Sequence, residues 1–273
     1  MHPVIFELGP FKIYSFGLMM GISFIIANWL LAKEFKRKKI NPEYASTITL
    51  IALIGGVSGS KILYLIENFG DFLKDPVAMT FSPGGLTFYG GFILVTAAIY
   101  FYSKKIDVKF IQIADSVAPA LLLAYGIARI GCHLAGDGDY GFPTTLPWGT
   151  NYSHGTYPPS YAFRGFPEIT SKFPGGIVPD TTLCHPTPIY ETIICSIFFW
   201  YLWKHRKKWT TEGKMFFMYL LLAGIERFSV EFLRLNPRLL FGLSEAQIIS
   251  AILIIVALMS LYSLHKKESN GLS

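Results

Sequence analysis

Seven long apolar stretches alternate with polar segments along this chain of 273 residues. Each stretch approaches the roughly 20 apolar residues that a helix needs to cross a bilayer. The predicted membrane helices cover, approximately, residues 13–32, 45–66, 84–103, 110–134, 185–203, 215–232 and 244–264. Because the length suits one helical bundle, the pattern predicts an all-α polytopic membrane protein with residues 1–273 in a single transmembrane domain.

Glycines mark the second and third of these stretches. Gly55, Gly56 and Gly59 give the second helix a small-residue face, which predicts close packing against another helix. The pairs Gly84-Gly85 and Gly90-Gly91 lie at the start of the third stretch. Such spacing is typical of a broken or re-entrant start, which is tolerated only where protein or water satisfies the backbone.

Composition and charge agree with a membrane protein and argue against a nucleic-acid partner. Hydrophobic residues make up 52% of the chain and charged residues only 15%, whereas soluble domains have about 25% charged residues. The net charge of +6 arises mainly from short segments between the apolar stretches. Most of the 24 Lys and Arg follow the first, third, fifth and seventh stretches. The positive-inside rule therefore predicts a multi-pass protein of the cytoplasmic (inner) membrane, with its N-terminus outside and its C-terminus in the cytoplasm.

A long loop, residues 136–185, separates the fourth and fifth stretches. It is polar and rich in Pro, Gly, Trp and Tyr, which favours an ordered cap on the extracytoplasmic side. Cys132 and Cys184 flank this loop, and their positions fit either a disulfide or two free thiols. With Cys195 they show no metal-ligand spacing, so we predict no metal site.

Arg129 lies inside the fourth apolar stretch. A charge there costs about 2.5–3.5 kcal/mol on insertion scales, so Arg129 is expected to face a partner, a cavity or a ligand. Small residues surround it and permit the close approach of another backbone or a lipid headgroup. Asp137 and Asp139 follow among glycines. These features fit either a salt bridge at a helix end or a site for an anionic headgroup, and we favour the headgroup.

A second intramembrane cation, Arg227, lies in the sixth stretch. Glu231 is four residues further on and shares its helical face, so a local ion pair would explain this arginine alone. Arg129 at similar depth argues for a further anion. A phospholipid phosphate would satisfy both guanidinium groups through bidentate contacts.

These residues belong to an ordered set of motifs that spans nearly the whole chain. The set resembles the prolipoprotein diacylglyceryl transferase family, a family of bacterial enzymes. The matching motifs are Ala128-Arg129-Ile130-Gly131, Gly84-Gly85-Leu86 with Gly90-Gly91, His185-Pro186-Thr187-Pro188-Ile189-Tyr190-Glu191, Asp115-Ser116-Val117-Ala118-Pro119, Glu226-Arg227-Phe228 with Glu231-Phe232, and Gly242-Leu243-Ser244 with Gln247.

The resemblance implies a reaction and two substrates. The family transfers the diacylglyceryl group of phosphatidylglycerol to the lipobox cysteine in the signal peptide of a prolipoprotein. A thioether forms and glycerol 1-phosphate leaves, and no cofactor takes part. Two arginines suit this chemistry, because the leaving phosphate gains negative charge in a medium of low dielectric constant.

Family position also implies roles for individual residues. Arg129 would hold the lipid phosphate, and Arg227 would be a second essential arginine oriented by Glu231. Asp137 stands at a family carboxylate that is usually Glu, and Gly141 closes the signature. The catalytic set implied is Arg129, Arg227, Tyr89 and Glu231, and the substrate-binding set is Arg129, Asp137, Gly141, Cys132, His185, Tyr190, Glu191 and Phe16.

The chain departs from the family pattern at several positions. Tyr89 stands where the family usually has His, Cys132 replaces an Asn, and Phe16 replaces a Tyr. One extra residue separates Asp137 from Gly141. A thiol has a pKa near 8.5 and a phenol near 10, so a tyrosine is a poorer base for the thiol than a histidine. His133 and His185 remain alternative bases, and we expect Tyr89 to position the substrate rather than to act as the sole base.

Three other readings compete with a transferase. A non-catalytic phospholipid-binding relative would keep the arginines and lack the base, and residue 89 is the feature that separates it from an enzyme. A transporter needs a polar path through both leaflets, whereas the charged positions here gather toward the outer half. A purely structural membrane protein leaves Arg129, Arg227 and Glu231 unexplained.

Overall fold

The computed structural model describes residues 1–9, 11–82 and 84–269. Seven of the helices in these ranges have 17 or more residues, and each falls on one of the predicted apolar stretches. The helical class and the positions of the helices are therefore confirmed. The long helices are α1 (Ser15–Arg37), α2 (Tyr44–Glu67), α5 (Phe88–Lys105), α6 (Phe110–Ala135), α9 (Thr187–His205), α10 (Lys214–Val230) and α11 (Glu245–Ser269).

Short elements connect these helices or precede them. Three two-stranded antiparallel sheets pair β1 with β2, β3 with β4, and β5 with β6. The short elements are β1 (Val4–Leu8), β2 (Phe11–Tyr14), α3 (Phe69–Phe72), α4 (Pro76–Phe81), β3 (Thr150–Asn151), α7 (Pro159–Ala162), α8 (Pro167–Thr170), η1 (Pro174–Gly176), β4 (Leu183–Cys184), η2 (Glu231–Leu233), β5 (Arg238–Leu240) and β6 (Leu243–Ser244).

Four of the described helices, α1, α2, α6 and α11, are long and apolar enough to cross a membrane. Only 11% of the most apolar window of α2, and likewise of α11, is buried against protein. Most of the surface of these two helices is therefore available to lipid. Helices α5, α9 and α10 are shorter, with 17 to 19 residues, and their crossing of the membrane stays a prediction.

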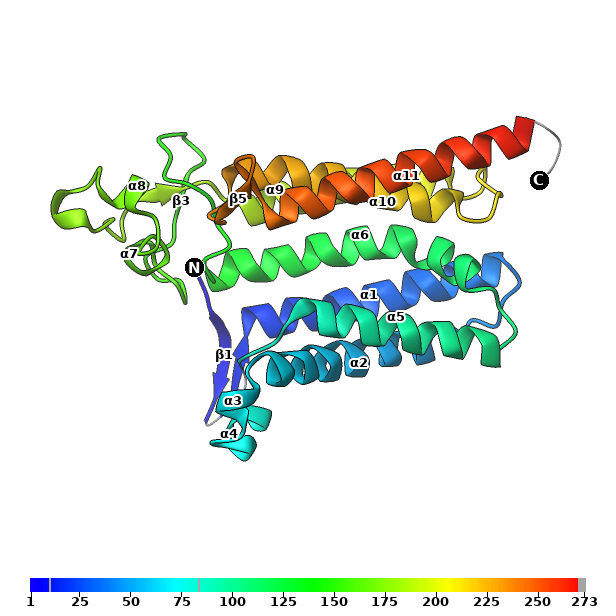
Figure 1. Cartoon of the computed structure of the whole chain (residues 1–273), viewed down its shortest axis with the longest axis horizontal. Coiled ribbons are helices and arrows are strands. Elements are labelled where there is room, and N and C mark those ends of the chain that lie inside the picture. The colour runs from blue at the N-terminus through cyan, green and yellow to red at the C-terminus, as the bar shows by residue number, and fades with distance from the viewer. Residues whose placement is uncertain (10, 83, 270–273) are drawn as a thin grey trace. The chain divides into compact units, whose positions relative to one another are not determined.

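Contacts divide the chain into two compact units, which we describe one at a time. Residues 27–117 form one unit, and residues 1–26 with 118–273 form the other. In the first unit, α2 and α5 lie side by side (Figure 1). A Cβ atom added to Gly59 would lie 2.5 Å from the carbonyl oxygen of Gly90, and one added to Gly91 would lie 2.6 Å from that of Gly56. The close packing predicted for the small-residue face is confirmed.

The glycine pairs at the start of the third stretch differ from each other in structure. Gly84-Gly85 precedes α5, and Gly85 has a φ of +70°, which a residue with a Cβ rarely adopts. Gly90-Gly91 lies inside the continuous helix α5, so the predicted broken start is wrong there. The second pair serves the contact with α2 rather than a break in the helix.

Side chains of α2 hold the segment that leads into α5. The Lys61 ammonium group donates hydrogen bonds to the carbonyl oxygens of Ser82 at 2.9 Å and Gly84 at 2.7 Å, and to that of Met79. One to two turns further along, the carboxylate of Glu67 accepts a 2.6 Å hydrogen bond from the Thr87 hydroxyl. The Lys61 ammonium group therefore has three backbone carbonyl oxygens as acceptors.

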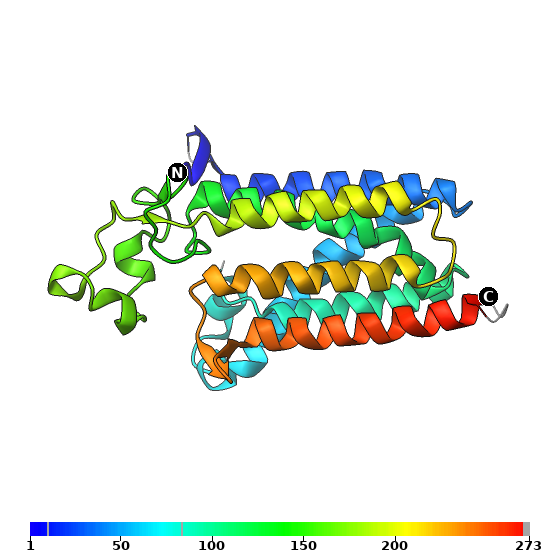
Figure 2. The same cartoon turned by 90° about the horizontal axis from the view of Figure 1, so that it is seen from above.

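In the second unit, α10 packs along α11 (Figure 2). Gly224 permits this contact, because a Cβ there would lie 2.9 Å from the Cγ1 atom of Ile254. A buried cluster joins α6 to α9 and α10 and contains Ala118, Leu122, Cys195, Leu202 and Met215. This packing places one polar turn from each of α6, α9 and α10 in a common region.

Residues 136–185, the predicted cap, contain a hydrophobic core of their own, and their place on the extracytoplasmic side stays a prediction. The core contains Tyr140, Tyr152, Phe163, Ile169, Val178 and Cys184. The rings of Tyr140 and Tyr152 stack with their centroids 4.2 Å apart. Cys132, Cys184 and Cys195 are all buried and free, so the alternative of a Cys132–Cys184 disulfide is excluded.

The N-terminal residues form a β-hairpin that the hydrophobic pattern did not predict. Ile13 pairs with Phe6, and Tyr14 pairs with Val4. Helix α1 therefore begins at Ser15, two residues after the predicted start. The amide of His2 donates a 2.8 Å hydrogen bond to the carbonyl of Leu134, which fixes the hairpin to the end of α6.

We expect Gly59→Ala to lower the stability of the protein. The added methyl group would meet the Gly90 carbonyl and the Leu94 side chain, and overpacking of this kind costs about 1–3 kcal/mol. The thermal unfolding midpoint of the detergent-solubilised protein should fall by several degrees. Gly56→Ala is the matched control, because a Cβ at Gly56 meets no atom of the described residues within 4 Å. Equal midpoints for the two variants would contradict the proposed contact.

Candidate active site

Glu191 lies at the centre of a buried ionic cluster. Its carboxylate lies one turn into α9 and is fully buried. It contacts Arg129 of α6 at 2.8 Å and Arg227 of α10 at 3.3 Å. The Tyr125 hydroxyl donates to it at 2.9 Å, and Arg234 Nη1 lies 3.5 Å away. Guanidinium groups from three segments therefore converge on one carboxylate.

A second carboxylate, Asp139, bridges two of these arginines. One oxygen binds Arg129 and the other binds Arg234. Gly136 and Gly138 both have positive φ, so the chain turns back at the end of α6 and brings Asp139 to Arg129. Burial by itself would raise the pKa of Asp139. The two guanidinium groups have the larger effect and lower this pKa to about 2. Asp139 therefore remains ionised at neutral pH.

Glu231 completes the cluster at the end of α10. It is fully buried and contacts Arg227 Nη2 at 3.0 Å, so the local ion pair that the sequence left open as an alternative is present. Asn236 Nδ2 donates to it at 2.6 Å and Ser244 Oγ at 2.7 Å. These neutral donors hold the Glu231 carboxylate in place, and through it the guanidinium of Arg227.

The cluster contains three guanidinium groups and three carboxylates. The sequence suggested that the two arginines need an anion from outside the protein. Their positive charge is already balanced by the carboxylates of Glu191 and Asp139, so an external anion is not required for charge balance. Donor capacity remains, however. Arg129 Nη2 and Arg227 Nε have no hydrogen-bond partner among the described residues. The Arg227 side chain is 27% exposed, against 8% for Arg234, so an anion can reach the cluster on the Arg227 side.

Cys132 and Asp137 lie beside the cluster. The Cys132 sulfur is 3.5 Å from Arg129 Nη1, and burial together with the charge of Asp139 raises the pKa of Asp137. Ligand atoms of Cys132, Asp137 and Asp139 all lie within 4.8 Å of one another, a spacing that a metal ion would accept. Both oxygens of Asp139 are already paired with arginines, so this group is better explained as part of the ionic cluster.

Backbone contacts hold Gly141 and the start of α9 together. The Gly141 amide donates to the His185 carbonyl at 2.9 Å. A Cβ at Gly141 would lie 2.9 Å from Thr187 Cγ2, so only glycine fits without displacement. The Thr187 hydroxyl in turn donates to the Asp139 carbonyl at 2.6 Å. This set of contacts fixes Asp139 relative to Glu191.

His185 and Tyr190 lie on the cap side of the same helix start. Nδ1 of His185 is 3.3 Å from the Tyr190 hydroxyl, which accepts a 2.8 Å hydrogen bond from Trp148. Partial burial lowers the pKa of His185 and so favours the neutral form of its ring. The other candidate histidine, His133, has its Nδ1 3.0 Å from the Tyr152 hydroxyl.

Phe16 and Tyr89 lie in different units. Phe16 is in the first turn of α1, and its Cα would be 3.2 Å from a Cβ at Gly131, so Gly131 lets α1 approach α6 closely. Tyr89 lies in the first turn of α5, is 43% exposed and meets Phe88 edge to face. The approach of Tyr89 to the arginine cluster stays a prediction.

The sequence did not assign Tyr125, Asp139 or Arg234 to the site. Tyr125 lies one helical turn before Arg129 and donates to the same carboxylate. Arg234 lies three residues after Glu231, beyond the predicted sixth stretch, and is 7% exposed. The four-residue spacing of Tyr125 and Arg129, which places both on one helical face, was a signal that could have identified Tyr125. The contact between Asp139 and Arg234 has no such local signal, because it joins residues 95 apart.

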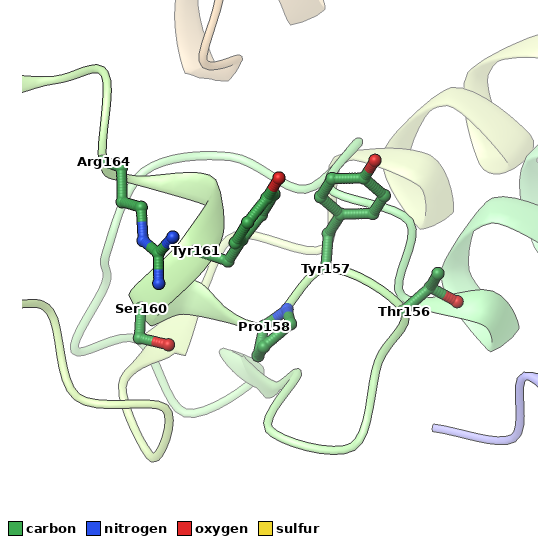
Figure 3. A pocket seen from close by; sticks show the side chains of 6 residues that line it. All are labelled: Thr156, Tyr157, Pro158, Ser160, Tyr161 and Arg164. Carbon is green, nitrogen blue, oxygen red and sulfur yellow. The ribbon is translucent and has the colours of Figure 1, made fainter. Parts of the chain in front are cut away.

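A separate open hollow lies in the cap (Figure 3). Its volume is about 470 Å³, and it is lined by Thr156, Tyr157, Pro158, Ser160, Tyr161 and Arg164. The Arg164 guanidinium lies 4.7 Å from the centre of the Tyr161 ring. None of the acidic or histidine residues assigned to the site lines this hollow, so it offers binding groups and no acid–base pair.

Comparisons with known proteins identify relatives along the whole chain. A family model for prolipoprotein diacylglyceryl transferase matches residues 3–263. The chain is 32% identical to a phosphatidylglycerol–prolipoprotein diacylglyceryl transferase of Clostridium tetani, over 94% of this chain and 96% of the relative. It is 30% identical to one of Clostridioides difficile, over 100% and 99%, and 28% identical to one of Leptospira interrogans, over 94% and 91%.

The family match covers the arginine cluster, the cap and the segment that leads into α5. It also agrees with the four described helices that are long and apolar enough to cross a membrane. The chain belongs to the prolipoprotein diacylglyceryl transferase family.

Proposed function

We propose that the chain transfers the diacylglyceryl group of phosphatidylglycerol to the lipobox cysteine of a prolipoprotein. The thiol sulfur forms a bond to the glycerol carbon of the lipid, and the bond from that carbon to the phosphate oxygen breaks. The thiol gives up its proton and glycerol 1-phosphate leaves. The observation that carries this proposal is the meeting of Arg129 and Arg227 on one buried carboxylate in a member of this family.

The arginines would act on the phosphate. Arg129 Nη2 and Arg227 Nε keep donor capacity, and Glu191 fixes both guanidinium groups before the lipid arrives. Preorganised donors stabilise charge that develops on the leaving oxygen without the cost of reorganising at that moment. Arg234 lies deeper and would act by holding Asp139 and Glu191 in place.

Other residues would complete the substrate site. These residues are linked to the cluster by the contacts described above, either directly or through a neighbouring residue: Cys132, Asp137, Gly141, His185 and Tyr190. Phe16 lies against α6 near Gly131. Tyr89 would position the thiol or the phosphate through its hydroxyl, and His185, whose pKa is lowered by partial burial, is the alternative acceptor for the thiol proton.

We also propose a topology of seven spans in the cytoplasmic membrane of a bacterium. Helices α5, α9 and α10 would cross together with the four longer ones. Clusters of Lys and Arg follow α1, α5, α9 and α11, which favours a cytoplasmic C-terminus and an outer N-terminus. The cap and the arginine cluster would then lie at the outer leaflet, where both the lipid and an exported signal peptide are accessible.

A non-catalytic phospholipid-binding protein is the alternative, because Tyr89 replaces the usual histidine. The matched relatives are named as transferases, which favours the enzyme. The two functions are separated by whether product forms, since both predict binding of phosphatidylglycerol.

The purified protein should add a diacylglyceryl group to a lipobox peptide in vesicles that contain phosphatidylglycerol, as measured by the mass of the peptide. Arg129→Ala and Arg227→Ala should nearly abolish this transfer, because each removes a phosphate donor and leaves Glu191 underpaired. Lys74→Ala is the control; its ammonium group pairs with Asp71 in an ion pair whose two side chains are both exposed, so its loss leaves no buried charge underpaired and should be tolerated. Lipid binding without transfer by the unmodified protein would favour the alternative function.

Tyr89→Phe should reduce transfer by less than about 10²-fold, because loss of a true general base typically costs 10²–10⁴-fold. Tyr89→His should be tolerated, since a histidine supplies the side chain usual in the family. The assay is the same peptide modification, followed over a range of pH. If Tyr89→Phe is as inactive as Arg129→Ala, the phenol itself takes the thiol proton.

A cysteine introduced at Lys38 should resist an impermeant thiol reagent added outside intact cells. Position 38 lies just beyond the end of α1, on the side that the positive-inside rule assigns to the cytoplasm. Ser171→Cys in the exposed part of the cap is the matched control and should react. The three native cysteines are buried, so their background should be low. Reaction at position 38 from outside would overturn the topology.

A further inference from the structure

The N-terminal hairpin has two faces of different character. Phe6 pairs with Ile13, and Leu8 pairs with Phe11. Directly opposed residues of antiparallel strands project to the same side of the hairpin, so these four side chains share one face. The intervening pair, Glu7 and Lys12, projects to the opposite side. The hairpin is therefore amphipathic.

The four apolar side chains are uncovered. Phe6 is 54% exposed, Leu8 67%, Phe11 75% and Ile13 46%. Removal of large apolar side chains from water is favourable, so a patch of four left in water is unfavourable. On the other face, Lys12 Nζ lies 2.9 Å from Glu7 Oε1, and both side chains are about half exposed. Tyr14, two residues from Lys12 on the same side of the strand, is 57% exposed there. One face is therefore apolar, and the other combines an ion pair with a tyrosine, a side chain that suits the level of the lipid headgroups.

The hairpin is fixed where a membrane helix begins. Ser15, the first residue of α1, donates its amide to the Pro3 carbonyl at 2.9 Å, and His2 donates to Leu134 at the end of α6. Figure 1 shows β1 running across the direction of α1 rather than along it. The first turn of α1 presents Phe16 and Leu18, which are 42% and 40% exposed. The apolar face of the hairpin is thus continuous in sequence with the apolar surface of a helix that can cross a membrane.

We propose that this face, made of Phe6, Leu8, Phe11 and Ile13, lies in the lipid leaflet at the boundary between headgroups and acyl chains. Glu7 and Lys12 would face the headgroups and water. Two strands leave their outer backbone N–H and C=O groups without strand partners, which forbids deep insertion and favours the interface. The choice of the outer leaflet rests on the proposed function and its topology, whereas the contact with lipid does not.

This placement would set the depth of the arginine cluster. The hairpin leads into Phe16 and Met19, and both pack against Gly131 closely enough that a Cβ there would lie 3.1–3.2 Å from them. Arg129 is two residues away on the same helix. A hairpin held at the headgroup boundary would keep Arg129 at the level of the lipid phosphates.

The test uses nitroxide labels at Phe11→Cys and Lys12→Cys, adjacent residues on opposite faces. The labelled proteins are placed in vesicles of phosphatidylethanolamine and phosphatidylglycerol, and relaxation by oxygen and by a water-soluble nickel chelate is measured. The ratio of oxygen to nickel accessibility should be several-fold higher at position 11 than at position 12. Leu8→Cys and Glu7→Cys form a second pair of the same kind. Unaltered protein supplies the background from the three buried cysteines.

Equal access of nickel to both positions would overturn the proposal. Protection of position 11 from both oxygen and nickel would also overturn it, in favour of a protein partner or a second copy of the chain. Transfer to the lipobox peptide is measured on the same labelled proteins. Transfer with a water-exposed position 11 would disprove the hairpin's role alone, whereas lipid contact without transfer would disprove the proposed function alone.

Discussion

The burial of Glu191 is the constraint on which the site depends. A carboxylate with no solvent exposure, on a helix within an apolar protein, is stable only if cations and donors surround it. Here they come from α6, from α10 and from the turn after η2. Removal of the carboxylate would leave three guanidinium groups competing for Asp139 and Glu231. The ion pairs therefore hold the ends of three helices at fixed separations while they form the site.

The cap and the turn at Gly136–Gly141 follow from that constraint. Asp139 must return to the end of α6 to neutralise Arg129 and Arg234, and two glycines with positive φ make the return possible. Gly141 then lies so close to Thr187 that a side chain would displace the start of α9. The lowered pKa of Asp139 reflects the same arrangement, since its carboxylate is worth more to the fold when charged.

Local pattern in the sequence predicted the helices well. Hydrophobic runs located the seven long helices, and the spacing of Arg227 and Glu231 placed both on one helical face and so offered their ion pair as an alternative, because both features depend on neighbours within a few residues. Contacts between distant residues were not predictable in this way. Asp139 meets Arg234 across 95 residues. The hairpin was missed because Ile13 and Tyr14 read equally well as the start of an apolar helix, and only pairing with Phe6 and Val4 makes them part of a strand.

The balance of charge in the cluster suits the proposed reaction better than an unneutralised set of arginines would. Phosphatidylglycerol carries a phosphodiester with one negative charge, whereas the leaving glycerol phosphate is a monoester with nearly two. Three unpaired guanidinium groups would bind both tightly and would retain the product. With Glu191, Glu231 and Asp139 in place, the cluster offers directed N–H donors against a near-neutral background. Such donors favour the species whose charge is growing, which is the condition for lowering a barrier rather than only binding a substrate.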